Sequence, residues 1–181
     1  MKNFDQTYSD KIFFATKSSP MLSTLAKFFA TFVLWLCLAV VVLFVFFSSL
    51  KNGAVASWNL LFLLETGVVM RVFVPWVVTI TMSLILRRKR PFRAEHHKPL
   101  IHMPIETPSF PSAHATIAFA FSTLFLYDPA LFAIAIVMAI CVSLSRVAVG
   151  VHYLSDILAG SVVGLIFGVL VFRFLPIIIG G

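Results

Sequence analysis

Residues 145–175, SRVAVGVHYLSDILAGSVVGLIFGVLVFRFL, decide the fold of this chain. A break at Gly150 is followed by a predominantly apolar run from His152 to Leu175. About 20 residues of this kind are enough for one helix to cross a bilayer. Except for Arg173, the charged residues of the stretch lie near its beginning. The stretch therefore predicts a transmembrane helix with polar chemistry at one end.

The composition of the whole chain also indicates a membrane protein. Of its 181 residues, 60% are hydrophobic and 12% are charged, whereas ordinary soluble domains carry roughly 25% charged residues. So few charged side chains cannot cover a water-facing surface of this size, and most of the surface must face lipid. A soluble enzyme, a disordered chain and a disulfide scaffold are excluded. The net charge of +7 remains to be explained.

The apolar runs predict an all-α, polytopic membrane bundle. We expect five membrane-spanning helices, at about residues 27–50, 68–86, 113–126, 130–148 and 152–175. Because the segment 58–86 is too long for one simple crossing, we expect residues 53–66 to lie at the interface or to be partly re-entrant. Cys37 and Cys141 lie inside apolar runs, so we expect buried thiols and no disulfide.

The residues before the first span mix polar and apolar side chains. Phe4, Tyr8 and Ile12 fall near one face of a helix over residues 4–16, which predicts an interfacial amphipathic helix. If this helix inserts into the membrane, the bundle has six elements. The chain is therefore expected to consist of an N-terminal interfacial segment, 1–26, and a membrane domain, 27–181.

One cluster of polar residues connects the last two spans. His152 and Asp156 are four residues apart in a predicted helical segment, so the carboxylate can hold the imidazole in one tautomer. Arg146, across the break at Gly150, can offer its forked guanidinium to an anion. The alternative is an intramembrane ion pair between Arg146 and Asp156 that serves packing.

Two further clusters flank the polar connection at 87–112. Ser112 is a good N-cap for the third span, where free backbone N–H groups favour an anion, and His114 in the first turn could protonate a leaving oxygen. Simple capping with an interfacial histidine is the alternative. The basic run Arg87 to Arg90, by itself, marks orientation or contact with acidic lipid head groups.

Together these clusters place cations and N–H donors around a histidine on one membrane face. This arrangement describes phosphoryl transfer through a covalent phosphohistidine. No set of carboxylates, cysteines or histidines has the spacing of a metal site, so we expect neither a metal ion nor another cofactor.

Three motifs carry a resemblance to a known family. Arg90-Pro91, then Pro-Ser112-x-His114, then Ser-Arg146-x5-His152-x3-Asp156 resemble the membrane type 2 phosphatidic acid phosphatases, whose pocket is shared with vanadium haloperoxidases. The resemblance covers roughly residues 60–175. It implies a helical bundle with its site at one membrane face, with His152 as the nucleophile, Asp156 as its orienting partner, His114 as the general acid, and Arg90, Ser112 and Arg146 as ligands of the phosphoryl oxygens.

The chain departs from the family pattern at one position. Ser83 stands where the first motif has a lysine, seven residues before Arg90. Arg87 precedes Arg90 by three residues, near the same helical face, and is our predicted replacement as a substrate-binding cation.

The resemblance implies a lipid phosphatase of a bacterial inner membrane. Its substrate would be a lipid phosphate or pyrophosphate, with polyprenyl pyrophosphate as the first choice and a phospholipid phosphate as the second. The expected partners are this substrate and membrane lipids, with no nucleic acid. The alternatives are a lipid-phosphate binding or transport protein with a degenerate site, favoured by Ser83, a haloperoxidase, and basic residues that only set orientation.

The predicted topology gives the net charge a location. The connections 87–112 and 146–152 are separated by two spans and emerge on the same side of the membrane, as does the N-terminus if there are five spans. Most of the 14 Lys and Arg residues lie on that side. The positive-inside rule would place this side in the cytoplasm, whereas a role in binding phosphate leaves the side open.

Glycines recur along the last predicted span. Gly160, Gly164 and Gly168 follow Asp156 at intervals of four. Such a stripe of small residues lets helices approach closely, so we expect it to turn the catalytic face into the bundle. A dimer interface is the alternative use of the same stripe, and the oligomeric state is left open.

Overall fold

A computed structural model describes residues 4–32, 35, 39, 57–94, 97–103 and 107–180 of the chain. All regular structure within these ranges is helical, in agreement with the predicted fold class. The helices are α1 (Phe4–Ser18), α2 (Pro20–Thr31), α4 (Ser57–Leu86), α5 (Pro91–Ala94), α6 (Ala113–Ser122) with the 3-10 turn η1 (Thr123–Phe125), α7 (Pro129–Ala148) and α8 (Leu154–Gly180).

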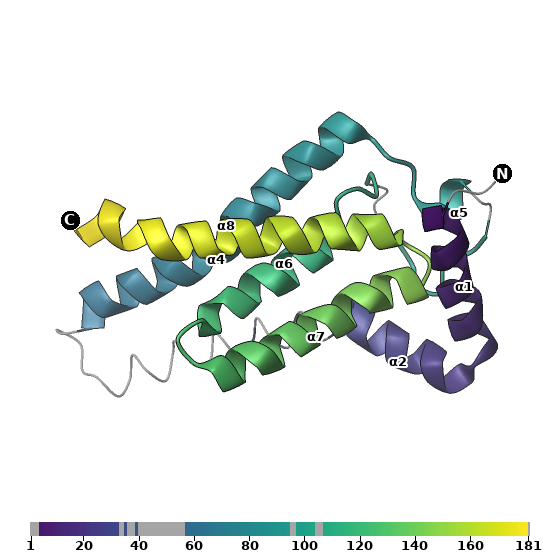
Figure 1. Ribbon diagram of the computed structural model, residues 1–181, viewed down its shortest axis with the longest axis horizontal. Helices are drawn as coiled ribbons and strands as arrows, with labels where there is room; N and C mark the ends of the chain where they lie inside the picture. The colour runs from purple at the N-terminus through teal and green to yellow at the C-terminus, as the bar shows by residue number, and fades with distance from the viewer. Residues whose placement is uncertain are drawn as a thin grey trace.

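Helix α6 is the central element of the bundle. It packs against α4, α7 and α8, and the long helices run side by side in Figure 1. Helices α1 and α2 lie at the end of the bundle where α7 is joined to α8, whereas the C-terminus lies at the opposite end (Figure 1). The predicted convergence of the N-terminus with the two polar connections on one end of the molecule is therefore confirmed.

Three segments among the described residues are long and apolar enough to cross a membrane: Met70–Ala94, Pro129–Ala148 and Leu154–Phe174. The residues Ala113–Phe125 form a shorter apolar helix. These agree with four of the predicted spans, while most of the predicted span at 27–50, including Cys37, lies outside the described residues. Cys141 is a free thiol. The count of five spans stays a prediction.

Two predicted boundaries differ from the structure in detail. Residues 57–86 form one continuous helix, α4, through Pro75, so the segment does not turn back between the interfacial part and the span; helices in apolar surroundings tolerate an internal proline when neighbours compensate the lost hydrogen bond. The interfacial position of residues 53–66 stays a prediction. His152 lies in the turn before α8 and is not part of that helix, which begins at Leu154.

Helix α1 has one exposed face and one face that is buried against the bundle. Phe4 and Tyr8 are exposed, as an interfacial helix requires. The residues that it buries against the bundle are Ser9, Asp10, Phe13 and Thr16. The predicted helix is confirmed, and its position at a membrane interface stays a prediction. The buried face of α1 contacts the start of α8 through Ser9. Helix α1 therefore lies next to residues of the predicted site.

The glycine stripe of α8 packs against α6 of the same chain. A Cβ atom on Gly160 would lie 2.5 Å from the carbonyl oxygen of Ser112, and one on Gly168 would lie 2.7 Å from Oγ1 of Thr123. The stripe therefore serves close packing within the bundle, as predicted, and this face is not available for a dimer.

Replacing Gly164 with alanine is expected to lower the free energy of unfolding by about 1–3 kcal/mol, the usual cost of overpacking. The new Cβ would meet the carbonyl oxygen of Thr116 and the amide nitrogen of Ala120, neither of which can rotate away. Val162→Ala, at an exposed position of the same helix, is the matched control. Thermal unfolding in detergent should show a lower midpoint for Gly164→Ala only; equal midpoints would contradict this packing.

Candidate active site

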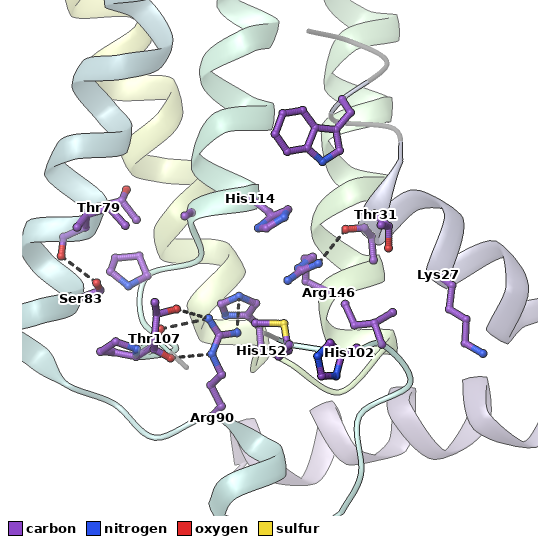
Figure 2. A pocket seen from close by; sticks show the side chains of 18 of the residues that line it. Lys27, Thr31, Thr79, Ser83, Arg90, His102, Thr107, His114, Arg146 and His152 are labelled. Atoms are coloured by element: carbon purple, nitrogen blue, oxygen red, sulfur yellow. Dashed lines mark hydrogen bonds between the residues drawn. The ribbon is translucent and has the colours of Figure 1, made fainter. Parts of the chain in front are cut away.

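A cavity of about 740 Å³ is lined in part by Lys27, Ala30 and Thr31 of α2. Helices α2, α4, α6 and α7 and the turn before α8 contribute to its wall. Figure 2 shows His114, Arg146 and His152 facing the same space. Four of the seven predicted site residues line the cavity: Arg90, His114, Arg146 and His152.

His152 is held with one ring nitrogen fixed and the other available. Its Nδ1 lies 2.8 Å from the carbonyl oxygen of Ser109, which can only accept, so Nδ1 carries the proton and Nε2 keeps its lone pair. The nearest oxygen of Asp156 is 3.4 Å from Nδ1, beyond the usual hydrogen-bond length. The main orienting acceptor is thus a backbone carbonyl. Helical spacing could not predict this acceptor, because His152 lies before α8 and is not part of a helix.

The protonation state of His152 follows from its surroundings. Burial lowers the pKa of His152 well below its ordinary value of 6.5, and the positive charges of Arg90 and Arg146 lower it further. The imidazole is therefore neutral at neutral pH, and its Nε2 lone pair is available to attack an electrophile.

In the ligand-free protein, we expect His152 to remain the neutral Nδ1–H tautomer at pH 6. Nitrogen NMR of selectively labelled histidine, assigned with a His152→Gln variant, measures this directly. Since the unfolded chain takes up the proton near pH 6.5 and the folded chain does so only at lower pH, folding stability should fall as the pH drops below about 6.5. A His152 signal that is half protonated at pH 6.5 or above would contradict the tautomer assignment.

Asp156 is fully buried and joins several segments. Its Oδ2 accepts from the backbone N–H of Tyr153 at 2.9 Å, and its Oδ1 accepts from Arg88 at 2.7 Å. Its backbone oxygen accepts from the N–H of Ser112 at 3.0 Å. The carboxylate is thus fixed chiefly by the backbone of Tyr153, just before α8, and by Arg88, which was not among the predicted site residues. The alternative considered for this cluster, an ion pair between Arg146 and Asp156, does not form.

Arg90 is fixed beside the nucleophilic nitrogen. Its Nε donates to the carbonyl oxygen of Thr107 at 2.8 Å, and one Nη donates to Oγ1 of the same residue at 2.8 Å. The other Nη donates to the carbonyl oxygen of Val151 at 3.1 Å and lies 3.3 Å from Nε2 of His152. The guanidinium is therefore within reach of an anion placed on Nε2 (Figure 2).

Two buried groups at the site lack partners in the described part of the chain. Arg146 donates through one Nη to the carbonyl oxygen of Ala30 at 2.8 Å, but its buried Nε has no acceptor. Ser112 occupies the N-cap position of α6 without the predicted side-chain capping bond, and its buried hydroxyl has no partner. Because unpaired buried polar groups are costly, both are suited to bind an anion. Ser112 itself is not among the lining residues, although Pro111 and Ala113 are.

Arg87 does not reach the cavity. Helix α4 ends at Leu86, Arg87 has a positive φ of 46°, and its exposed guanidinium donates to the carbonyl oxygen of Leu84. The prediction that Arg87 replaces the missing lysine as a substrate-binding cation is therefore wrong. Ser83 does line the cavity, together with Thr79, so that the α4 wall presents hydroxyl groups.

The opposite wall of the cavity includes residues that the sequence analysis did not select. Lys27 and Trp35 come from the N-terminal region, and His102 comes from the polar connection. None of the described residues that line the cavity is acidic, whereas Lys27, Arg90 and Arg146 are basic. The cavity therefore favours an anionic group. Within the described ranges, no three His, Cys, Asp or Glu side chains lie close enough to hold a metal ion.

The chain is similar to a known family of proteins. The family model of the PAP2 superfamily matches residues 58–178. The decaprenylphosphoryl-5-phosphoribose phosphatase of Mycobacterium tuberculosis (strain CDC 1551 / Oshkosh) is 35% identical over 102 residues, which cover 55% of this chain and 54% of that protein. The chain thus spans about half the length of this curated relative.

Two crystal structures have the same fold. Aquifex aeolicus LpxE superposes with a TM-score of 0.72 at 19% identity, covering 95% of this chain and 96% of that chain. The transmembrane PAP2 type phosphatidylglycerolphosphate phosphatase of Bacillus subtilis superposes with a TM-score of 0.68 at 21% identity, covering 96% and 85%.

Proposed function

The chain belongs to the PAP2 superfamily, and from this premise we propose that it is a membrane lipid phosphatase that works through a phosphohistidine at position 152. The observation that carries the proposal is the buried, neutral His152, whose unprotonated Nε2 accepts from the fixed guanidinium of Arg90 at 3.3 Å and faces the cavity. It lies in a cavity whose described lining residues are basic or neutral.

In the first step, the Nε2 lone pair of His152 attacks phosphorus and the bond from phosphorus to the leaving oxygen breaks. Arg90, Arg146 and the Ser112 hydroxyl donate to the non-bridging oxygens, where negative charge is concentrated in the transition state. His114 lines the same cavity and gives a proton to the leaving oxygen. The lipid leaves as an alcohol from a monoester, or as a lipid monophosphate from a diphosphate.

In the second step, water attacks the phosphorus of the phosphohistidine. His114, now deprotonated, accepts a proton from the water, and the N–P bond breaks. This returns Nε2 its lone pair and releases inorganic phosphate. The backbone contact of Nδ1 with Ser109 stays in place through both steps and keeps Nε2 directed at the cavity.

The lipid nature of the substrate is supported by the setting of the cavity. It lies at one end of a bundle with three candidate membrane spans, so a head group can enter it while the lipid tail remains in the bilayer. The curated relative is named for a decaprenyl-linked phosphosugar and one structural neighbour for a phosphatidylglycerol phosphate. A polyprenyl pyrophosphate and a lipid phosphomonoester are the two substrate classes to be compared.

A non-catalytic lipid-phosphate binding protein is the second candidate. It is favoured by Ser83, because a hydroxyl stands in the cavity wall where the family motif has a lysine. Such a protein would bind the head group through Arg90 and Arg146 and release no phosphate.

The test is phosphate release by the purified protein in detergent from a panel of short-chain lipids: a polyprenyl pyrophosphate, phosphatidic acid, phosphatidylglycerol phosphate and a polyprenyl phosphosugar phosphate. We expect release from at least one of them and inhibition by orthovanadate, which mimics the five-coordinate phosphorus. Binding without release from any of the four would favour the second candidate and contradict the phosphatase proposal.

A further inference from the structure

We infer that Asp5 and Arg88 are positioning residues, which fix the Asp156 carboxylate and thereby make the docking of helix α1 part of the catalytic geometry. This inference rests on the proposed phosphatase function. Neither residue lines the cavity, so both would act through Asp156 and the beginning of α8.

Arg88 binds Asp156 and Asp5 at the same time. One Nη is 2.7 Å from Oδ1 of Asp156 and the other is 2.7 Å from Oδ2 of Asp5. The Nη on the Asp156 side also donates to Oγ of Ser155 at 2.5 Å, and the guanidinium lies 4.2 Å from the centre of the Tyr153 ring. These contacts fix the planar group on several sides, which a lysine could not reproduce.

Asp5 and Ser9 of α1 satisfy the first free N–H groups of α8. Oδ1 of Asp5 accepts from the backbone N–H of Ser155 at 3.0 Å, and Oγ of Ser9 accepts from that of Leu154 at 3.0 Å. Oγ of Ser155 donates to Oδ2 of Asp5. The N-terminus of α8 is thus capped by a different helix, about 150 residues earlier in the chain, and its position depends on α1.

The charge of the buried Asp156 is balanced by Arg88, which is itself paired with Asp5. The Asp156 side chain is 0% exposed, whereas those of Asp5 and Arg88 are 19% and 29% exposed. A carboxylate without any exposure needs a partner cation, and removing that partner leaves an uncompensated buried charge. Burial by itself raises the pKa of Asp5, but hydrogen bonds from Ser155 and Arg88 outweigh it and hold the pKa below its ordinary value. Asp5 is therefore charged at neutral pH and can hold Arg88.

A displacement of Asp156 would also shift His152 and the N-terminal end of α6. Its Oδ2 lies 3.4 Å from Nδ1 of His152, and its backbone oxygen accepts from the N–H of Ser112. Ser112 in turn precedes the first turn of α6, which carries His114. A shift of about 1 Å in groups that align reactants can cost on the order of 100-fold in rate. Loss of the Asp5–Arg88 contact should therefore slow the chemical step and leave substrate binding nearly unchanged.

The experiment measures kcat and KM for phosphate release in Asp5→Asn, Arg88→Gln, Arg88→Lys and the double variant Asp5→Asn/Arg88→Gln. We expect kcat to fall about tenfold in Asp5→Asn and about 100-fold in Arg88→Gln, with KM within about twofold of wild type. Arg88→Lys should recover part of kcat because it keeps the charge. The double variant should be no slower than Arg88→Gln, because both changes interrupt one chain of contacts.

Two control variants should retain wild-type kcat. Lys89→Gln removes a neighbouring exposed cation, and Asp128→Asn removes a carboxylate that caps α7 while keeping a capping side chain.

Thermal unfolding identifies any variant that loses its fold, and the mild Asp5→Asn change keeps the test decisive in that case. Wild-type kcat in Asp5→Asn, a loss confined to KM, or losses that multiply in the double variant would overturn the inference. An inactive wild-type protein would overturn the proposed function and this inference together, whereas active wild type with unchanged variants overturns the inference alone.

Discussion

Replacing His152 with glutamine is expected to lower kcat for phosphate release by at least about 10⁴-fold, the order of loss seen when a covalent nucleophile is removed. Glutamine is similar to histidine in size and is uncharged, so the shape of the cavity should be kept. An amide has no basic lone pair with which to attack phosphorus, and the covalent route is closed.

The measurement is steady-state phosphate release with whichever lipid of the panel wild type hydrolyses fastest. Thermal unfolding and binding of inorganic phosphate should both remain close to wild type, which separates loss of chemistry from loss of fold. Retention of more than about one tenth of wild-type kcat would contradict the role of His152 as nucleophile.

Replacing Arg146 with glutamine is expected to lower kcat/KM by about 10² to 10³-fold, as for the loss of one donor that stabilises transition-state charge. Arg146 is buried in the cavity wall and its Nε has no acceptor among the described residues, so that nitrogen is suited to donate to a phosphoryl oxygen. Arg146→Lys keeps the charge but loses the planar fork, and we expect it to be intermediate.

The same substitution also removes a contact between helices. Arg146 donates to the carbonyl oxygen of Ala30 in α2, so a lower unfolding midpoint is expected beside the loss of rate. Arg173→Gln removes an exposed arginine toward the C-terminal end of α8 and is the matched control, with wild-type kcat/KM and midpoint. A wild-type kcat/KM in Arg146→Gln would exclude Arg146 from the binding of the phosphoryl group.

The helices themselves could be predicted because their ends are encoded locally. Asp128 caps the start of α7 with two hydrogen bonds of 3.0 Å, and Pro129 follows it. Gly150, with a positive φ of 81°, follows the end of the same helix. The predicted and observed limits of α7 differ by one residue. The glycine stripe likewise follows from helical spacing alone, and its packing against α6 agrees with the prediction.

The parts of the site that the sequence could not predict depend on tertiary position. Helical spacing favoured Arg87 over Arg88, but the chain leaves the helix at Leu86 and the turn sends Arg88 inward. The acceptor for His152 is the backbone oxygen of Ser109. Every residue has a backbone carbonyl group, so the residue types in the sequence do not indicate which one accepts this hydrogen bond. Asp5 reaches α8 only through the docking of α1 across the end of the bundle, which no local pattern encodes.

Covalent phosphorylation of Nε2 of His152 can be detected by trapping the intermediate. Wild-type protein is mixed with a lipid substrate carrying ³²P in its terminal phosphate, quenched in alkali within milliseconds, digested and mapped. We expect an acid-labile label on the peptide that contains His152, formed at least as fast as inorganic phosphate is released, and no label in His152→Gln. Release of phosphate by the wild type without any labelled peptide, or with the label on another residue, would contradict it.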